Sequence, residues 1–149
     1  MSTGSKQKSN GIAFVNDNNP IMDTISRQLA ISGFNILFHT ESIKNAIGKL
    51  EAMDVFPETC IVDLDFHDRH ILAEIRQFTE SFPQIKFIAY SETDNERIVK
   101  SLLKLGFKAY LLIGCDENDF GRAIEKVSND ESFFSVGVAA IAKEYYSNN

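Results

Sequence analysis

The chain has 149 residues, the length of one domain with a core large enough to fold unaided. Apolar residues make up 44% and charged residues 24%, which is an ordinary globular composition and excludes a disordered or fibrous chain. The 15 Lys and Arg residues against 21 Asp and Glu residues give a net charge of −6, which argues against direct binding of nucleic acid by this chain.

Membrane insertion and secretion are equally unsupported by the sequence. No apolar run approaches the ~18 residues that a membrane-spanning helix needs, and the N-terminal stretch MSTGSKQKSN lacks the apolar segment of a secretory signal. The two cysteines, Cys60 and Cys115, fit a reducing compartment and do not form a disulfide framework. We therefore expect a cytoplasmic protein without membrane contact.

In chain order, a polar tail at 1–10 comes first, followed by short apolar runs that alternate with segments of helical spacing. The runs are too short for helices and suit strands buried on both faces; they lie at 11–15, 34–38, 60–64, 85–90 and 108–113. The first helical segment carries Ile21, Ile25 and Leu29 and ends at Gly33. Three later segments begin at residues suited to N-caps, namely Ser42, Asp94 or Asn95, and Asp116.

This alternation predicts an α/β fold with a doubly wound, five-stranded parallel sheet over residues 11–128. Residues 129–149 form a linker and an extra helix at 135–146, with Ser135 as its cap, which either packs on the domain or leads away from it. In doubly wound folds the functional crevice lies beyond the carboxyl ends of the strands. The residues just after each apolar run are therefore the candidates for a site.

Polar side chains follow three of these strands: Asp17 after the first, Asp63 and Asp65 at the third, and Ser91 after the fourth. If the first and third strands are neighbours, Asp17 and Asp63 meet at one edge, where Mg²⁺ would relieve the repulsion between their carboxylates. A carboxylate beside Mg²⁺ and a small hydroxyl is also a reasonable phosphoryl acceptor.

Each of these residues also has a plainer interpretation. Asp17 and Ser91 are each suited to a turn or a helix cap, and Tyr110 to core packing. His39 is most simply a surface or loop histidine, because no metal-ligand spacing recruits it. The combination, with each residue at the end of its own strand, is more specific than any single member.

The combination resembles the receiver domain of bacterial response regulators, over roughly residues 11–128. Three stretches carry the resemblance: IAFVNDNNPIMDTISRQLAISGF, CIVDLDFHDRHILAEI and FIAYSETDNERIVKSLLKLGFKAYLLI. It implies a (βα)5 flavodoxin-like fold and a role in two-component phosphorelay signalling, with a sensor histidine kinase as partner. Family analogy also suggests a homodimer.

The resemblance also implies a role for each residue that matches a position of the family pattern. Asp63 is the phosphoacceptor, and Ser91 is the hydroxyl that contacts a phosphoryl oxygen. Asp17 and Asp63 bind Mg²⁺ directly, and Asp65 binds it through its backbone carbonyl. Two further positions complete the set: Asn16, which contacts the metal through water, and Tyr110, which with Ser91 forms the switch.

Three positions depart from the family pattern. Asn16 replaces the first acidic residue of the pair, which removes one negative charge from the metal site. His67 stands at the position of the usual proline. Ile113 replaces the active-site lysine, and Ile can neither pair with Asp63 nor hold a phosphoryl oxygen. We therefore expect an atypical receiver in which phosphorylation is poorly coupled to output.

The C-terminal segment AIEKVSNDESFFSVGVAAIAKEYY resembles the linker of nitrate-response-type regulators, whose LuxR-like output domain binds DNA. We expect either a receiver part of a longer transcription regulator, which we favour, or a stand-alone receiver that retains a linker-like helix. In both cases we expect a protein that is not an enzyme. One alternative is a pseudo-receiver that acts as a protein-interaction module without phosphate. A remote alternative is a haloacid-dehalogenase-type phosphatase that uses Asp63 and Asp65, although its motif normally follows the first strand.

Overall fold

The computed structural model describes residues 10–148 and contains a six-stranded parallel sheet in the order β2-β1-β3-β4-β5-β6. The expected tail at 1–10 falls, except for its last residue, outside the described part. The strands are β1 (Gly11–Asn16), β2 (Asn35–Thr40), β3 (Thr59–Asp63), β4 (Lys86–Ser91), β5 (Ala109–Leu112) and β6 (Phe133–Phe134). The predicted doubly wound α/β fold is confirmed, with one short strand more than expected.

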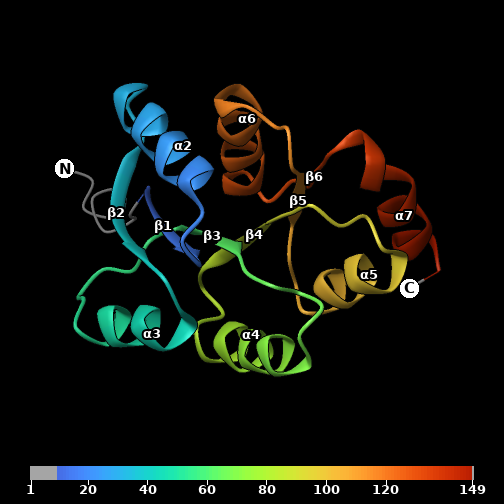
Figure 1. The fold of residues 1–149 in the computed structure, drawn as a ribbon, viewed down its shortest axis with the longest axis horizontal. Helices are drawn as coiled ribbons and strands as arrows, with labels where there is room; N and C mark the ends of the chain where they lie inside the picture. Colours follow the sequence, from blue (N-terminus) through green and yellow to red (C-terminus); the bar gives the residue numbers. More distant parts are fainter. Residues whose placement is uncertain (1–9, 149) are drawn as a thin grey trace.

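Helices cover both faces of the sheet (Figure 1). They are α2 (Pro20–Ile31), α3 (Ile43–Glu51), α4 (Arg69–Ser81), α5 (Glu96–Lys104), α6 (Glu117–Ser128) and α7 (Val136–Ser147). Helices α2 and α6 lie on one face, and α3, α4 and α5 lie on the other, with α7 beyond α5. None of the helices in residues 10–148 is both long and apolar enough to span a bilayer.

The central strands are buried on both faces, as their continuous apolar runs predict. Every residue of β1 is buried, and its side chains alternate between the two clusters of core residues above and below the sheet. Five helices begin at a side chain that accepts a hydrogen bond from a first-turn backbone N–H. These N-caps are Asn19, Ser42, Asp68, Asn95 and Asp116.

The order of the strands reverses beside β1. From β1 the chain moves outward to β2, and then returns to place β3 on the other side of β1. Within the β1–β3 pair, Asn16 lies opposite Asp63 in the register. The switch point therefore lies at the carboxyl ends of β1 and β3, where a doubly wound sheet forms its crevice.

The C-terminal segment packs against the domain and does not lead away from it. Strand β6 was not predicted, because two residues are too few to show a pattern; it pairs with Ala109 and Tyr110 of β5. Val138 and Ala142 of α7 are buried in the same core cluster as α5. Ser135 stands at the N-cap position of α7, but its hydroxyl accepts a hydrogen bond from the backbone N–H of Leu112 instead of capping the helix.

Candidate functional site

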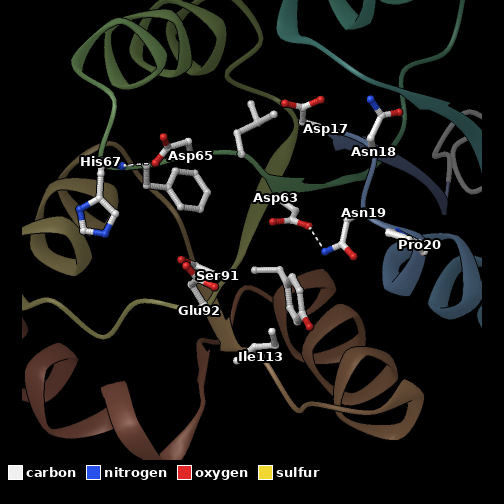
Figure 2. Close-up of a pocket in the computed structure, with 13 residues that line it drawn as sticks. Asp17, Asn18, Asn19, Pro20, Asp63, Asp65, His67, Ser91, Glu92 and Ile113 are labelled. Atoms are coloured by element: carbon white, nitrogen blue, oxygen red, sulfur yellow. Dashed lines mark hydrogen bonds between the residues drawn. The ribbon is translucent and has the colours of Figure 1, made fainter.

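A pocket of about 540 Å³ opens at the carboxyl ends of the strands (Figure 2). It is formed by the loops after β1, β3, β4 and β5. Thirteen residues line it: Asp17, Asn18, Asn19, Pro20, Asp63, Leu64, Asp65, Phe66, His67, Tyr90, Ser91, Glu92 and Ile113. Four predicted site residues, Asp17, Asp63, Asp65 and Ser91, are thus brought together, and so is Ile113.

Asp63 ends β3 and lies half-buried in the pocket. One of its carboxylate oxygens, Oδ2, accepts a hydrogen bond of 2.7 Å from the side-chain amide of Asn19. Burial raises the pKa of the Asp63 carboxyl above its usual value, the Asn19 bond lowers it, and the nearby charges of Glu92 and Asp17 raise it. Ionisation of the Asp63 carboxyl is therefore less favourable in the pocket than in water.

Asp17 and Asp65 are exposed on the loops that follow β1 and β3. The Asp65 carboxylate accepts a hydrogen bond of 3.1 Å from the backbone N–H of His67, which closes a turn in the loop after β3. A side-chain oxygen of Asp65 therefore shapes the loop.

The opposite wall of the pocket comes from β4 and β5. Ser91 is only 8% exposed, and its hydroxyl oxygen accepts a hydrogen bond of 3.1 Å from the backbone N–H of Thr93. Ile113 is 53% exposed, and its backbone N–H donates to the Ser91 carbonyl at 2.9 Å. This wall offers a small hydroxyl and an apolar side chain, and the residues that line the whole pocket include neither Lys nor Arg.

Two predicted residues lie outside the pocket lining. Asn16 is 2% exposed; its Oδ1 contacts the ring Nε2 of His39, and its Nδ2 donates to the Asn19 carbonyl at 3.4 Å. Tyr110 is fully buried, and its hydroxyl donates to the Thr93 carbonyl at 2.6 Å. Tyr110 thus contacts the loop that follows Ser91, whereas Asn16 faces β2 and the start of α2.

Sequence reasoning missed two residues beside Asp63, and it misplaced His39. Asn19 contacts Asp63 directly, Glu92 adds a carboxylate to the pocket, and His39 lies within β2, where its ring nitrogen Nδ1 is 3.7 Å from Asp23. His39 is therefore a half-buried strand residue, and its interpretation as a loop histidine was wrong. The signal for Asn19 was present, since Asn before Pro20 at a helix start is typical of an N-cap.

The donor chemistry of the pocket fits Mg²⁺. Carboxylates of Asp17 and Asp63 and the backbone carbonyl of Asp65 are oxygen ligands, which Mg²⁺ prefers, and Mg²⁺ keeps several waters instead of requiring a full protein cage. Across the described residues, no group of three or more His, Cys, Asp or Glu side chains is placed to hold a metal ion. That finding is compatible with a site of two carboxylates.

Two curated relatives are each 27% identical to this chain over the aligned residues. No protein-family model matches the chain. The response regulator protein VraR of Staphylococcus saprophyticus is 27% identical over 128 residues, which are 85% of this chain and 60% of VraR. VraR of Staphylococcus aureus is 27% identical over 124 residues, or 83% of this chain and 58% of that protein. The chain thus spans about three fifths of the length of these relatives.

The solved structures agree with the sequence comparison. The isolated receiver (REC) domain of RcsB from Salmonella enterica serovar Typhimurium, in its apo form, superposes with a TM-score of 0.76 at 18% identity. The overlap covers 91% of this chain and 99% of that domain. The chain has the fold of a response-regulator receiver domain.

The chain also matches a longer form of RcsB. RcsB bound to a promoter in the presence of the phosphomimetic BeF3⁻ superposes with a TM-score of 0.75 at 16% identity. This overlap covers 95% of the present chain but only 70% of that RcsB chain. The longer protein therefore contains a region to which this chain has no counterpart in the overlap.

Proposed function

We propose that the receiver domain accepts a phosphoryl group on Asp63 and relays it as a signal in a two-component system. The observation that carries the proposal is the position of Asp63, which ends a central strand and opens into a pocket shared with Asp17 and Ser91. Carboxylates from neighbouring strand ends and a small hydroxyl are the groups that phosphoryl transfer to an aspartate requires.

Four residues of the pocket, together with the buried Tyr110, have proposed roles in this transfer. Asp17, Asp63 and the backbone carbonyl of Asp65 hold Mg²⁺, which when bound offsets the negative charge that gathers in the pocket during transfer. The Ser91 hydroxyl donates to a phosphoryl oxygen once it turns from its present contact with Thr93. Tyr110 senses that movement, because its hydroxyl bonds to the carbonyl of the same Thr93.

The partners follow from the kinship with response regulators. A sensor histidine kinase supplies the phosphoryl group, and the output is control of transcription by a DNA-binding region outside this chain, with a homodimer as the assembly. The length of the VraR relatives supports a further region, since the chain spans about three fifths of them. The free thiols of Cys60 and Cys115 support a cytoplasmic location.

A second function is favoured by one feature, the exposed Ile113 at the position of the family lysine. Without that lysine, the residues that line the pocket include neither Lys nor Arg to contact a phosphoryl group. The alternative is a pseudo-receiver that binds a partner protein whether or not Asp63 is modified.

The deciding experiment incubates the wild-type chain with acetyl phosphate and Mg²⁺ and measures intact mass. We expect one added phosphoryl group, which Asp63→Asn abolishes. Asp68→Asn is the matched control, because Asp68 caps α4 outside the pocket and Asn is an equally good cap. The control keeps the label.

Each other outcome points to a different function. If the wild type stays unlabelled and Mg²⁺ does not bind, the pseudo-receiver is favoured. Label that persists in Asp63→Asn would show that Asp63 is not the acceptor. Continuous release of phosphate from a phosphoester would favour the phosphatase that uses Asp63 and Asp65.

A further inference from the structure

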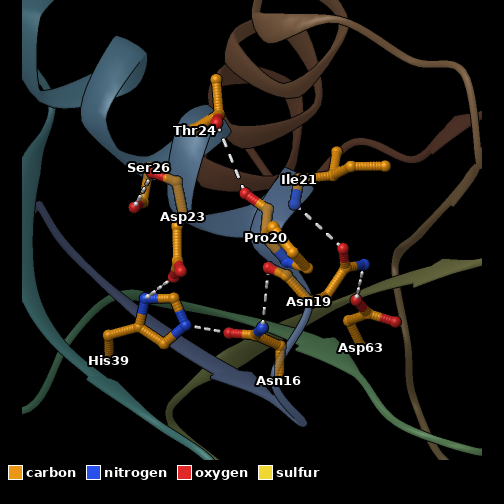
Figure 3. Close-up of polar contacts among 9 residues, drawn as sticks. All are labelled: Asn16, Asn19, Pro20, Ile21, Asp23, Thr24, Ser26, His39 and Asp63. Atoms are coloured by element: carbon orange, nitrogen blue, oxygen red, sulfur yellow. Dashed lines mark hydrogen bonds and ion pairs between the residues drawn. The ribbon is translucent and has the colours of Figure 1, made fainter.

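The side-chain amide of Asn19 is fixed by two contacts at once (Figure 3). Its oxygen accepts a hydrogen bond of 3.0 Å from the backbone N–H of Ile21, which caps α2. Its nitrogen donates to Oδ2 of Asp63 at 2.7 Å. Turning the amide over would set its oxygen against the Asp63 carboxylate and its NH₂ against an N–H donor. Both contacts therefore select the same orientation.

The backbone of Asn19 is held as firmly as its side chain. The preceding residue, Asn18, has a φ of 52°, a left-handed conformation that Asn tolerates better than most residues. The Asn19 carbonyl accepts from the backbone N–H of Met22 at 3.0 Å and from Nδ2 of Asn16 at 3.4 Å. The sharp turn after β1 and the start of α2 thus aim the Asn19 side chain at β3.

A series of polar contacts supports this arrangement from β2. Asn16 is 2% exposed, and its Oδ1 contacts His39, whose other ring nitrogen faces Asp23 of α2. Figure 3 shows the contacts running from Asp23 through His39, Asn16 and Asn19 to Asp63. Because Asn16 is an amide, it donates to the Asn19 carbonyl, which a carboxylate at this position cannot do.

The Asp63 carboxylate has few other favourable contacts. Asp17 and Glu92 repel it, and Ile113 is the side chain at the position where the resemblance expects a lysine. Among the side-chain hydrogen bonds of residues 10–148, the one that reaches the Asp63 carboxylate comes from Asn19. A carboxylate that is free to rotate presents its oxygens to a phosphorus atom in many orientations, most of them unproductive.

We propose that Asn19 is the positioning residue of the phosphoacceptor, and that it supplies from the α2 side the hydrogen-bond donor that Ile113 cannot supply. The amide holds Oδ2, which leaves Oδ1 as the oxygen that attacks. In the step, Oδ1 forms a bond to phosphorus while the bond from phosphorus to the leaving group breaks, and the leaving group departs with that electron pair. This inference rests on the proposed acceptor role of Asp63.

The test measures the rate of labelling against acetyl phosphate concentration for the wild type and Asn19→Ser. Serine keeps the N-cap of α2 but is too short to hold Asp63. We expect the maximal rate to fall about tenfold, which corresponds to about 1.4 kcal/mol, while the half-saturating concentration of donor stays unchanged. Asn19→Asp, which keeps the cap but turns the donor into a repelling carboxylate, should fall further.

Repeating the comparison in the Ile113→Lys background separates positioning from simple folding. A lysine there gives Asp63 a second donor, so Asn19→Ser should lower the maximal rate by less than about threefold. The matched control is Asn129→Ser, which removes an amide-donated hydrogen bond to the Glu125 carbonyl at the opposite edge of the sheet. Its labelling should equal that of the wild type.

The outcomes separate the two proposals. A wild type that takes no label overturns the acceptor role of Asp63 and this inference with it. A labelled wild type with an equal or faster Asn19→Ser variant overturns this inference alone. The same tenfold loss in both the Ile113 and Ile113→Lys backgrounds, or a loss that appears only as weaker donor binding, also overturns it, since neither reflects positioning of Asp63.

Discussion

The amino and carboxyl ends of the strands differ in how their charges are balanced. At the amino ends, Lys86 begins β4. Its ammonium group lies 3.2 Å from Asp130, 3.9 Å from Glu58 and 3.2 Å from the Ser128 carbonyl. At the carboxyl ends, one pocket is lined by four carboxylates and by no Lys or Arg. The four carboxylates belong to Asp17, Asp63, Asp65 and Glu92. The chain neutralises its own charge where the role is structural, and leaves charge for a ligand to neutralise where we propose that chemistry occurs.

The largest effect on stability should come from removing the ion pairs of Lys86 at the amino ends of the strands. Lys86→Met removes the ammonium group that lies 3.9 Å from the Glu58 carboxylate, whose side chain is only 11% exposed. We expect the free energy of unfolding to fall by about 2 kcal/mol, because removing a cation from beside a poorly solvated carboxylate is costly. Urea denaturation at neutral pH measures it.

Two comparisons make that result specific. Lys104→Met makes the same substitution at an exposed position of α5 and should change stability by less than about 0.5 kcal/mol. Labelling of Asp63 in Lys86→Met should match the wild type under conditions where both are folded. A similar loss of stability in both lysine variants would mean that the ion pairs of Lys86 add no specific stability.

Adding Mg²⁺ should test the charge balance at the carboxyl ends of the strands. If Mg²⁺ binds the folded pocket, a concentration ten times its Kd should stabilise the wild type by about 1.4 kcal/mol, read as a rise in Tm. Asp17→Asn should remove most of the rise in Tm, whereas Asp130→Asn, beside Lys86 at the amino ends of the strands, should keep it. An equal Mg²⁺ effect in both variants would place the ion elsewhere.

The smallest expected effect is a pH dependence at Asp63. Burial, together with Glu92 and Asp17, holds the pKa of its carboxyl above the unfolded value, so the folded state binds this proton more tightly. Ionisation therefore destabilises the folded state once the pH exceeds the raised pKa, and acidification toward the unfolded value removes that penalty.

Asp63→Asn removes the ionisation, so it should raise Tm modestly at neutral pH in the absence of Mg²⁺. The gain should shrink as the pH falls toward the usual range of an Asp carboxyl. Thermal melts of both proteins across this range measure the difference. A gain that grew on acidification would contradict the raised pKa.

The fold was predictable because its signals are local. Apolar runs of strand length and capped segments of helical spacing follow one another along the chain, and the predicted caps Ser42 and Asp116 are confirmed. The strand-end rule then placed Asp17, Asp63, Asp65 and Ser91 correctly at one pocket.

The contacts around Asp63 were not predictable in the same way. Asn19 and Asp63 are 44 positions apart, and Asn16 and His39 are 23 apart, so no periodicity links them. Asn16 illustrates the reason: its position at a strand end indicates the pocket, but its rotamer is decided by a histidine on the neighbouring strand. Strand β6 was missed for a different reason, because its hydrogen bonds from Phe133 to Lys108 and from Ser135 to Tyr110 are made by a segment with no strand pattern of its own.

The shortness of β6 bears on how molecules of this protein meet one another in concentrated solution. An open strand edge is a template onto which another chain adds a strand, and natural sheets protect such edges by keeping them short or covered. Here the β5 edge ends in two paired residues, and the chain then turns directly into α7. Unwanted growth of the sheet from molecule to molecule is therefore disfavoured on this side, and the six residues of β2 form the longer exposed margin.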